Sequence, residues 1–247
     1  MNTLPVKKDY VTLSVSDGSD MNAYTAMPAK IEKALPGLII FQEAFGVNSH
    51  IRNIAERFAS QGYVVIAPEL FHRTAPKGFE GSYTDFAAVA PHVQGLTENG
   101  LEVDIRASWG WLKEQTNVQI DHISCIGYCM GGRTAFFANT LLPFKAAVSY
   151  YGGRIALDLL KYASKLHAPM LFYWGGLDKH IPVEQIESIT TALDKENKRY
   201  TNVKFSYADH GFNCDARASF NPEASKNAWA LTLAFLTSAD DPIKKQI

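Results

Sequence analysis

One segment of the sequence places a nucleophile at the spacing that would expose it. Cys129 stands two residues after Gly127 and two residues before Gly131, between the apolar run 122–127 and the helix-forming run 131–141. A sharp turn from a strand into a helix strains its central residue, so the residues two before and two after must be small. Such a turn also puts the thiol at a helix N-terminus, which favours a thiolate. Cys129 is therefore a candidate nucleophile, with a structural cysteine as the alternative.

A thiol nucleophile needs a general base, and the position of His210 favours that role. For a nucleophile on such a turn, the chain order is nucleophile, then Asp or Glu, then His. Four of the seven histidines precede Cys129, and His167 precedes the apolar run 170–174. His210 follows the alternating run 203–207, at the carboxyl end of a predicted strand, where open α/β sheets place their sites. His180 is the second candidate.

Asp178 is the candidate acid that would orient the histidine. It follows the predicted strand 170–174 and a Gly-Gly pair, which leaves its loop free to aim the carboxylate at a neighbouring strand end. Asp209 adjoins His210 but should point to the other side of its strand. The alternative interpretation of Asp178 is a solvated turn or a helix cap.

Alternating strands and helices are expected to position these residues. Short apolar or alternating runs typical of strands recur at 38–41, 63–67, 122–127, 146–150, 170–174 and 203–207. Apolar residues at helical spacing lie within 51–58, 101–112, 183–193 and 228–235. This alternation predicts βαβ crossovers, and hence an α/β fold with a mainly parallel central sheet and helices on both faces.

Two further segments complete the predicted organisation. The alternating stretches 10–15 and 21–27, joined by Asp17-Gly18, predict an antiparallel hairpin. Residues 68–99, interrupted by prolines and glycines, predict an excursion over the surface with one short helix. Since no repeat and no linker divides the chain, we expect one domain over residues 1–247.

Composition excludes several classes of protein. The 247 residues carry 24 Lys and Arg against 25 Asp and Glu, and a net charge of −1 argues against a nucleic-acid partner. No apolar run approaches the ~18 residues of a membrane-spanning helix, and the stretch Met1–Lys8 lacks the apolar core of a signal peptide. We therefore expect a cytoplasmic protein without a membrane partner. No pattern in the sequence predicts an oligomeric state.

The three cysteines are too few and too odd in number for a disulfide framework. They are Cys125, Cys129 and Cys214. Because no group of Cys and His residues has zinc spacing, we expect neither a metal nor a cofactor. Cys125 lies within the apolar run 122–127 and is interpreted as a core residue.

Four motifs together resemble the dienelactone hydrolase family, whose members are α/β hydrolases with a cysteine in place of the usual serine. The motifs are, in chain order, Gln42–Gly46, Gly127–Gly132, Gly175–Asp178 and His210–Phe212. The likeness extends from about Val11 to Phe235. It implies a single α/β-hydrolase domain that spans nearly the whole chain.

The resemblance also implies roles for individual residues. It makes Cys129 the nucleophile, His210 the base and Asp178 the acid that orients the base. Glu43 matches the family glutamate that contacts the resting thiol. Because a carboxylate beside a thiolate is costly, Glu43 is expected to keep the thiol protonated until substrate displaces it.

Substrate contacts are expected from both backbone and side chains. Two backbone N–H groups, those of Ala44 and Met130, would form the oxyanion hole. In the best-known family members an arginine four residues after the histidine binds the substrate carboxylate, but this chain has Cys214 there. The cations left to recognise an anionic substrate are Arg217, Arg73 and Lys77. Tyr83, in the 68–99 excursion, is expected to help cover the site.

A cysteine nucleophile restricts the class of substrate. A thiol has a pKa of ~8.5 and an alkyl alcohol one near ~15.7, so the intermediate of an alkyl ester favours expelling the thiolate again by roughly 10 kcal/mol. We therefore predict hydrolysis of an activated carboxylic ester, above all an enol-lactone such as a dienelactone, through a Cys-His-Asp triad and a thioester acyl-enzyme. The alternatives are a carboxylesterase or thioesterase with another small-molecule substrate, and a non-catalytic binding protein with the same fold.

Overall fold

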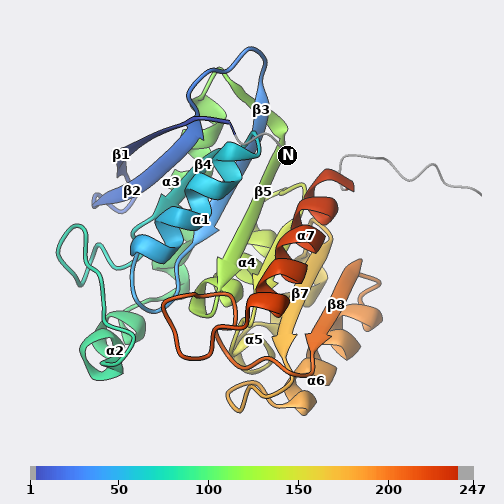
Figure 1. Cartoon of the computed structure of the whole chain (residues 1–247). Helices are drawn as coiled ribbons and strands as arrows, with labels where there is room; N and C mark the ends of the chain where they lie inside the picture. The colour runs from blue at the N-terminus through green and yellow to red at the C-terminus, as the bar shows by residue number, and fades with distance from the viewer. Residues whose placement is uncertain (1–3, 239–247) are drawn as a thin grey trace, which may run out of the picture.

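A central sheet of eight strands runs through residues 4–238, the part of the chain that the computed structural model describes (Figure 1). The strands are β1 (Val6–Ser14), β2 (Asp20–Pro28), β3 (Leu35–Phe41), β4 (Val64–Pro68), β5 (Val118–Tyr128), β6 (Ala147–Tyr150), β7 (Met170–Gly175) and β8 (Tyr200–Phe205). The predicted domain also includes residues 1–3 and 239–247, which lie outside the described residues, as does the start of the Met1–Lys8 stretch.

The strand order in the sheet is β1-β2-β4-β3-β5-β6-β7-β8. β1 pairs antiparallel with β2, and β2 pairs antiparallel with β4. All other neighbours pair in parallel, from β4 with β3 to β7 with β8. The expected N-terminal hairpin and the mainly parallel sheet are thus both confirmed.

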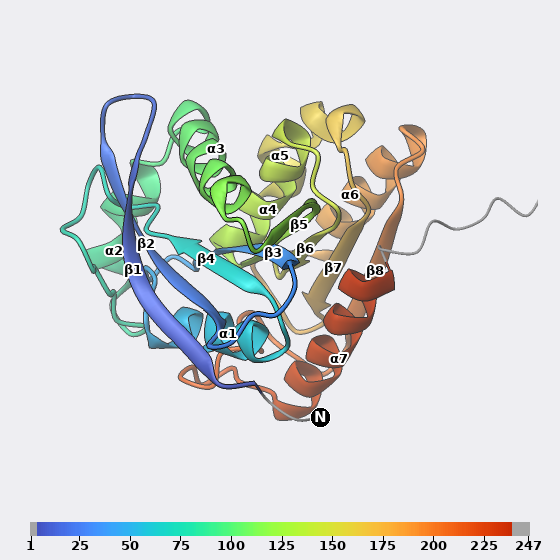
Figure 2. The same ribbon diagram turned by 90° about the horizontal axis from the view of Figure 1, so that it is seen from above.

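Helices cover both faces of this sheet. They are α1 (Ser49–Ser60), α2 (Phe86–Gln94), α3 (Glu98–Glu114), α4 (Met130–Leu141), α5 (Ile155–Asp158), α6 (Val183–Lys195) and α7 (Pro222–Ser238), with the 3₁₀ helix η1 over Leu160–Lys165. Figure 2 shows α3, α4, α5 and α6 on one face and α1 and α7 on the other. Because both faces are covered, the central strands are apolar throughout, and Leu38, Ile39 and Ile40 of β3 are fully buried.

The functional end of the molecule is the edge where the parallel strands finish. Figure 1 shows that β5, β7 and β8 all point toward the same edge, where α2, α5 and the loop between β8 and α7 also lie. Parallel pairing fixes this arrangement, because strands that run in one direction must end on one side. Residues that follow these strands are therefore brought together.

The structure differs from the sequence-based prediction mainly at element boundaries. β8 covers Tyr200–Phe205 instead of 203–207, and the short helices α5 and η1 were not predicted because a single turn carries no readable periodicity. The 68–99 excursion contains α2 as its short helix, as expected, and α3 begins at Glu98. Within residues 4–238, no helix is both long and apolar enough to cross a membrane.

Candidate active site

Cys129 occupies a strained turn between β5 and α4. Its φ of 54° and ψ of −115° lie in a region that side chains other than glycine rarely adopt. The turn is tight enough that a Cβ on Gly127 would overlap the carbonyl oxygen of Gly131. A Cβ on Gly131 would likewise overlap the carbonyl oxygen of Phe41. The structure therefore explains why glycines flank the cysteine at these two positions.

Cys129, His210 and Asp178 form a hydrogen-bonded chain. The Sγ atom of Cys129 lies 3.1 Å from Nε2 of His210, and Nδ1 of His210 lies 2.8 Å from Oδ2 of Asp178. The second oxygen of Asp178 accepts the backbone N–H of His180 at 2.8 Å. The three side chains follow β5, β7 and β8, so the sheet brings them together at its carboxyl edge. The structure thus unites the three residues that the sequence analysis selected.

The pKa values of His210 and Asp178 depend on the contact between these two side chains. Burial disfavours the charged form of His210, but the electrostatic interaction with Cys129 and the hydrogen bond that the ring donates to Asp178 outweigh it and raise the pKa of His210 to about 10. Burial acts against ionisation of Asp178 as well, yet its hydrogen bond to His210 and the charge there keep the pKa of this carboxyl below its ordinary value. The contact between Asp178 and His210 therefore favours the charged forms of both side chains.

A cleft of about 570 Å³ opens at the thiol. Its lining includes six residues of the predicted site: Ala44, Tyr83, Cys129, Met130, His210 and Arg217. The other lining residues are Phe45, Phe86, Val93, Arg133, Gly153, Arg154 and His180. The apolar residues come from the loop after β3 and from the α2 segment, whereas Arg133 and Arg154 belong to the α4 and α5 side. The cleft thus combines an apolar wall with basic side chains.

Arg73 does not line this cleft, contrary to the expectation that it contacts substrate. Its guanidinium donates to Asp17 at 2.6 and 2.8 Å and to the buried Asp104 at 2.8 and 2.9 Å. Two carboxylates therefore fix Arg73 as a structural tie between the β1–β2 turn and α3. His72 also contacts Asp104, at 3.1 Å. Sequence spacing could not reveal these partners, because they lie 56 and 31 positions away.

Glu43 is fully buried two residues after β3 and is not among the residues that line the cleft. Its Oε1 lies 3.5 Å from Nη1 of Arg217, which gives the carboxylate a positively charged neighbour. No hydrogen bond joins Glu43 to Cys129 within residues 4–238, because the thiol is directed at His210. The hydrogen-bond partner of the Glu43 side chain is thus Arg217, and the expected contact of Glu43 with the resting thiol stays a prediction.

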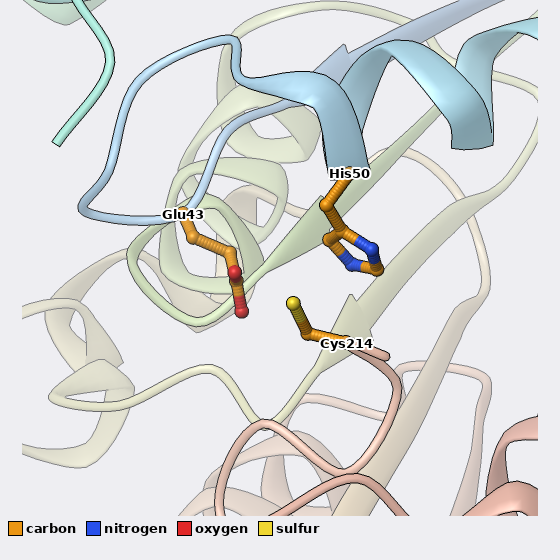
Figure 3. Close-up of side chains that lie close together, drawn as sticks. All are labelled: Glu43, His50 and Cys214. Atoms are coloured by element: carbon orange, nitrogen blue, oxygen red, sulfur yellow. The ribbon is translucent and has the colours of Figure 1, made fainter. Parts of the chain in front are cut away.

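Cys214 occupies the place where the family pattern has an arginine, and it is fully buried. Its thiol donates to the hydroxyl of Tyr83 at 3.2 Å, and that hydroxyl also accepts from Nδ2 of Asn48 at 2.8 Å. Glu43, His50 and Cys214 in addition bring potential metal-ligand atoms within 4.8 Å of one another (Figure 3). Cys125 has no such setting: it is buried in the core of β5, as expected.

Arg133 and Arg154 are cleft residues that the sequence analysis missed. Arg133 lies in the first turn of α4, four positions after Cys129, and Arg154 closely follows β6. Both residues could have been selected from the sequence. Sites in this type of sheet lie at the carboxyl ends of the parallel strands, where the helix after the nucleophile begins and where β6 ends. Both side chains also pair with Asp158, at 3.0 Å each, and this shared partner reduces their net charge.

The strand order and the strained strand-to-helix turn, with an acid and a histidine after later strands, define an α/β hydrolase. More closely, the chain belongs to the dienelactone hydrolase family, which its residues 21–239 match. It is 34% identical over 236 residues to a protein of Synechocystis provisionally named carboxymethylenebutenolidase, covering 92% of this chain and 95% of the relative. A Salmonella typhimurium protein of the same provisional name is 36% identical, with 89% and 83% covered.

A solved structure supports the same assignment. The crystal structure of a protein from Klebsiella pneumoniae, provisionally described as a dienelactone hydrolase, superimposes with a TM-score of 0.86 at 30% identity. The match covers 94% of this chain and 99% of that one. The fold expected from the sequence is confirmed, and the chain is a member of a hydrolase family.

Proposed function

We propose that this protein hydrolyses activated carboxylic esters, above all an enol-lactone of the dienelactone type, through a Cys-His-Asp triad and a thioester acyl-enzyme. The observation that carries the proposal is the continuous contact from Cys129 through His210 to Asp178 at the mouth of a cleft. The provisional name of two relatives, carboxymethylenebutenolidase, agrees with this proposal. Nothing in this reaction calls for a cofactor.

The first step transfers the Cys129 proton to Nε2 of His210 and leaves a thiolate at the N-terminus of α4. This transfer is supported by the 3.1 Å separation of the two atoms and by Asp178, which stabilises the imidazolium from its other nitrogen. The thiolate then attacks the carbonyl carbon of the ester. The carbonyl π electrons move to oxygen and form a tetrahedral oxyanion.

The backbone N–H groups of Ala44 and Met130 are the proposed donors to that oxyanion. Both residues line the cleft beside the thiol. The N–H of Met130 is the first of helix α4, so it has no carbonyl partner within the helix and can donate to a ligand. Such donors act mainly on the transition state, where the negative charge on oxygen develops.

Collapse of the intermediate breaks the bond between the carbonyl carbon and the leaving oxygen, which takes the proton from His210. An enolate or aryloxide leaves as a much weaker base than an alkoxide, so it competes with expulsion of the thiolate. His210 then removes a proton from water, and the resulting hydroxide attacks the thioester. The carbon–sulfur bond breaks, the acid is released, and Cys129 regains a proton.

The cleft suggests which activated esters fit. Phe45, Tyr83 and Phe86 offer an apolar, largely aromatic wall suited to a planar unsaturated ring, and Arg217 offers a cation for a substrate carboxylate. Arg217 lies near the rings of Phe45 and Tyr83, at 5.8 and 5.9 Å from their centroids. A substrate anion that approaches Arg217 would compete with Glu43 for it. We propose that this competition displaces Glu43 and couples substrate binding to activation of the thiol.

The decisive experiment is to trap the acyl group. The protein is mixed with p-nitrophenyl acetate, quenched, digested and analysed by mass spectrometry; an acetyl group on Cys129 is expected. Cys129→Ala should lose the adduct and nearly all turnover. Cys125→Ala, which removes a buried thiol from the same strand, should keep both. An adduct at another residue, or turnover by Cys129→Ala at the wild-type rate, would contradict the proposed nucleophile.

A substrate panel distinguishes the proposed class from its alternatives. We expect rates to rise steeply as the leaving-group pKa falls, with a dienelactone turned over better than a neutral aryl ester and alkyl esters barely cleaved. Faster cleavage of acyl thioesters than of the dienelactone would identify a thioesterase instead. A protein that turns over no member of the panel would be a binding protein.

A further inference from the structure

Three side chains capable of binding a metal converge beneath the active site. Glu43 comes from the loop after β3, His50 from the first turn of α1, and Cys214 from the loop between β8 and α7. Figure 3 shows the three side chains pointing toward one another from these separate segments. A carboxylate oxygen, an imidazole nitrogen and the sulfur all lie within 4.8 Å of one another. None of the three belongs to the hydrogen-bonded chain that includes Cys129.

The hydrogen bonding of this cluster is incomplete. Glu43 and Cys214 are fully buried, and His50 is 7% exposed. Despite this burial, Oε2 of Glu43 and Nε2 of His50 have no hydrogen-bond partner among residues 4–238. Buried polar atoms are nearly always paired, and an unpaired one costs about 1–3 kcal/mol, more if it is charged. Two such atoms in one cluster indicate that a ligand belongs there.

We propose that Glu43, His50 and Cys214 form a binding site for Zn²⁺. Thiolate, imidazole and carboxylate are the three side-chain ligands that zinc takes in proteins, whereas Mg²⁺ and Ca²⁺ prefer oxygen alone. Zinc would supply a partner to both unpaired atoms at once. The Cys214 thiol would release its proton to solvent on binding.

The surroundings fit a bound cation. Nδ1 of His50 faces Oδ1 of Asp215 at 3.6 Å, the arrangement in which a carboxylate orients a metal-binding imidazole. Asp215 is exposed, so the His50 side of the site lies near solvent, from which an ion would enter. The Tyr83 hydroxyl, 3.2 Å from Sγ of Cys214, is near enough to hold a water molecule as the fourth ligand.

The charges of the site can accommodate zinc beside Arg217. The Glu43 carboxylate and the Cys214 thiolate together neutralise the two charges of the ion. Arg217 contacts only Oε1 of Glu43, at 3.5 Å, which leaves Oε2 for the metal. Ligands of a tetrahedral zinc lie about 3.3–3.8 Å apart, given bond lengths of about 2.0–2.3 Å. Because the ligand atoms lie within 4.8 Å of one another, the side chains need to approach by at most about 1–1.5 Å.

The test measures binding without substrate, so it does not depend on the proposed hydrolysis. Chelator-treated full-length protein is titrated with ZnCl₂ by calorimetry, and with Co²⁺ followed by its visible spectrum. We expect one Zn²⁺ per chain and the intense bands of tetrahedral, thiolate-bound Co²⁺. MgCl₂ should give no detectable binding. No Zn²⁺ binding by the wild type would overturn the proposal.

Variants test whether the metal binds to Glu43, His50 and Cys214 or to the pair Cys129 and His210 in the cleft. Cys214→Ala and His50→Gln should each weaken Zn²⁺ binding by more than about 100-fold, and Asp215→Asn by about 10-fold or more. Cys129→Ala should bind Zn²⁺ as the wild type does. The opposite pattern, loss in Cys129→Ala and retention in Cys214→Ala, would place the ion at Cys129 and His210 and refute the site. Circular dichroism identifies folded variants, and His50→Gln decides the matter if Cys214→Ala does not fold.

Discussion

Asp178 and His210 meet at the edge of the sheet, with Oδ2 of Asp178 2.8 Å from Nδ1 of His210. They follow β7 and β8, two neighbouring parallel strands, so the pairing of these strands sets the distance between the two side chains. The other oxygen of Asp178 is held by the N–H of His180. The carboxylate therefore has one orientation, and it fixes the orientation of the imidazole in turn.

Replacing this carboxylate by an amide should uncouple the imidazole from the thiol. We expect Asp178→Asn to lower kcat for aryl esters by about 10²- to 10⁴-fold, because the amide neither stabilises the imidazolium nor favours the reactive tautomer. KM should change little, since Asp178 is not among the residues that line the cleft. Steady-state kinetics test this expectation.

Asp209→Asn is the matched control for that change. Asp209 adjoins His210 but accepts its backbone N–H instead of its ring, and an asparagine oxygen can accept the same bond. Its activity should therefore stay close to that of the wild type. If Asp209→Asn lost as much activity as Asp178→Asn, the orienting role would not belong to Asp178.

Titration of His210 provides a second prediction. Burial lowers the pKa of His210, but the Cys129 thiolate and Asp178 together raise it to about 10. Cys129→Ala removes the larger of these two raising effects, so the pKa of His210 should fall well below 10. Two-dimensional NMR of the imidazole resonances as a function of pH measures this shift. An unchanged titration would show that Asp178 alone sets the pKa.

The same coupling predicts how stability depends on pH. Because the pKa of His210 in the folded protein, about 10, exceeds its ordinary 6.5, the charged imidazole stabilises the fold fully below pH 6.5. That contribution is lost as the pH rises toward 10. The difference in Tm between the wild type and His210→Gln should accordingly shrink across this range, as thermal melts at successive pH values would show.

The glycines of the strained turn should tolerate no side chain. In Gly127→Ala the new Cβ would overlap the carbonyl oxygen of Gly131, so we expect a loss of about 3 kcal/mol or more in the free energy of unfolding. Gly110→Ala in α3 is the matched control, because within residues 4–238 no atom beyond its own chain neighbours and helix backbone lies within 4 Å of its added Cβ. It should gain up to about 1 kcal/mol from helix propensity. Urea unfolding compares the two, and equal effects would contradict the steric argument.

Anion recognition can be tested with two arginines in different settings. Arg217→Gln should lower kcat/KM for an anionic enol-lactone about 10- to 100-fold more than for a neutral aryl ester, because it removes one charge-assisted hydrogen bond. Arg73→Gln should leave that ratio unchanged while lowering Tm, since it strips a partner from the buried Asp104. A ratio altered by Arg73→Gln but not by Arg217→Gln would show that Arg73, and not Arg217, contacts the substrate anion.

Most of the fold was predictable because its signals are local. Apolar runs and helical spacing identified β3 to β8 and the longer helices, since these patterns depend on neighbours a few residues apart. The turns α5 and η1 escaped because four to six residues show no periodicity. The ends of β8 were misplaced because the strand is half exposed and its apolar pattern is weak.

The sequence by itself determined the candidate site residues that can be recognised from their position along the chain. Cys129 is recognisable from its flanking glycines, because backbone sterics at the turn permit almost nothing else there. Asp178 and His210 follow from strand order, because parallel strands end at one edge of a sheet.

Only the tertiary structure decided which charged and polar side chains meet. Arg217 and Glu43 are 174 positions apart and come into contact only because the loops after β3 and β8 converge. The spacing of residues in the sequence does not predict that Arg73 binds the carboxylates of Asp17 and Asp104. Nor does it predict that Glu43, His50 and Cys214 lie close together. Ion pairs and metal ligands depend on distances of a few ångströms in space, and those distances are set when the sheet and its covering helices have packed.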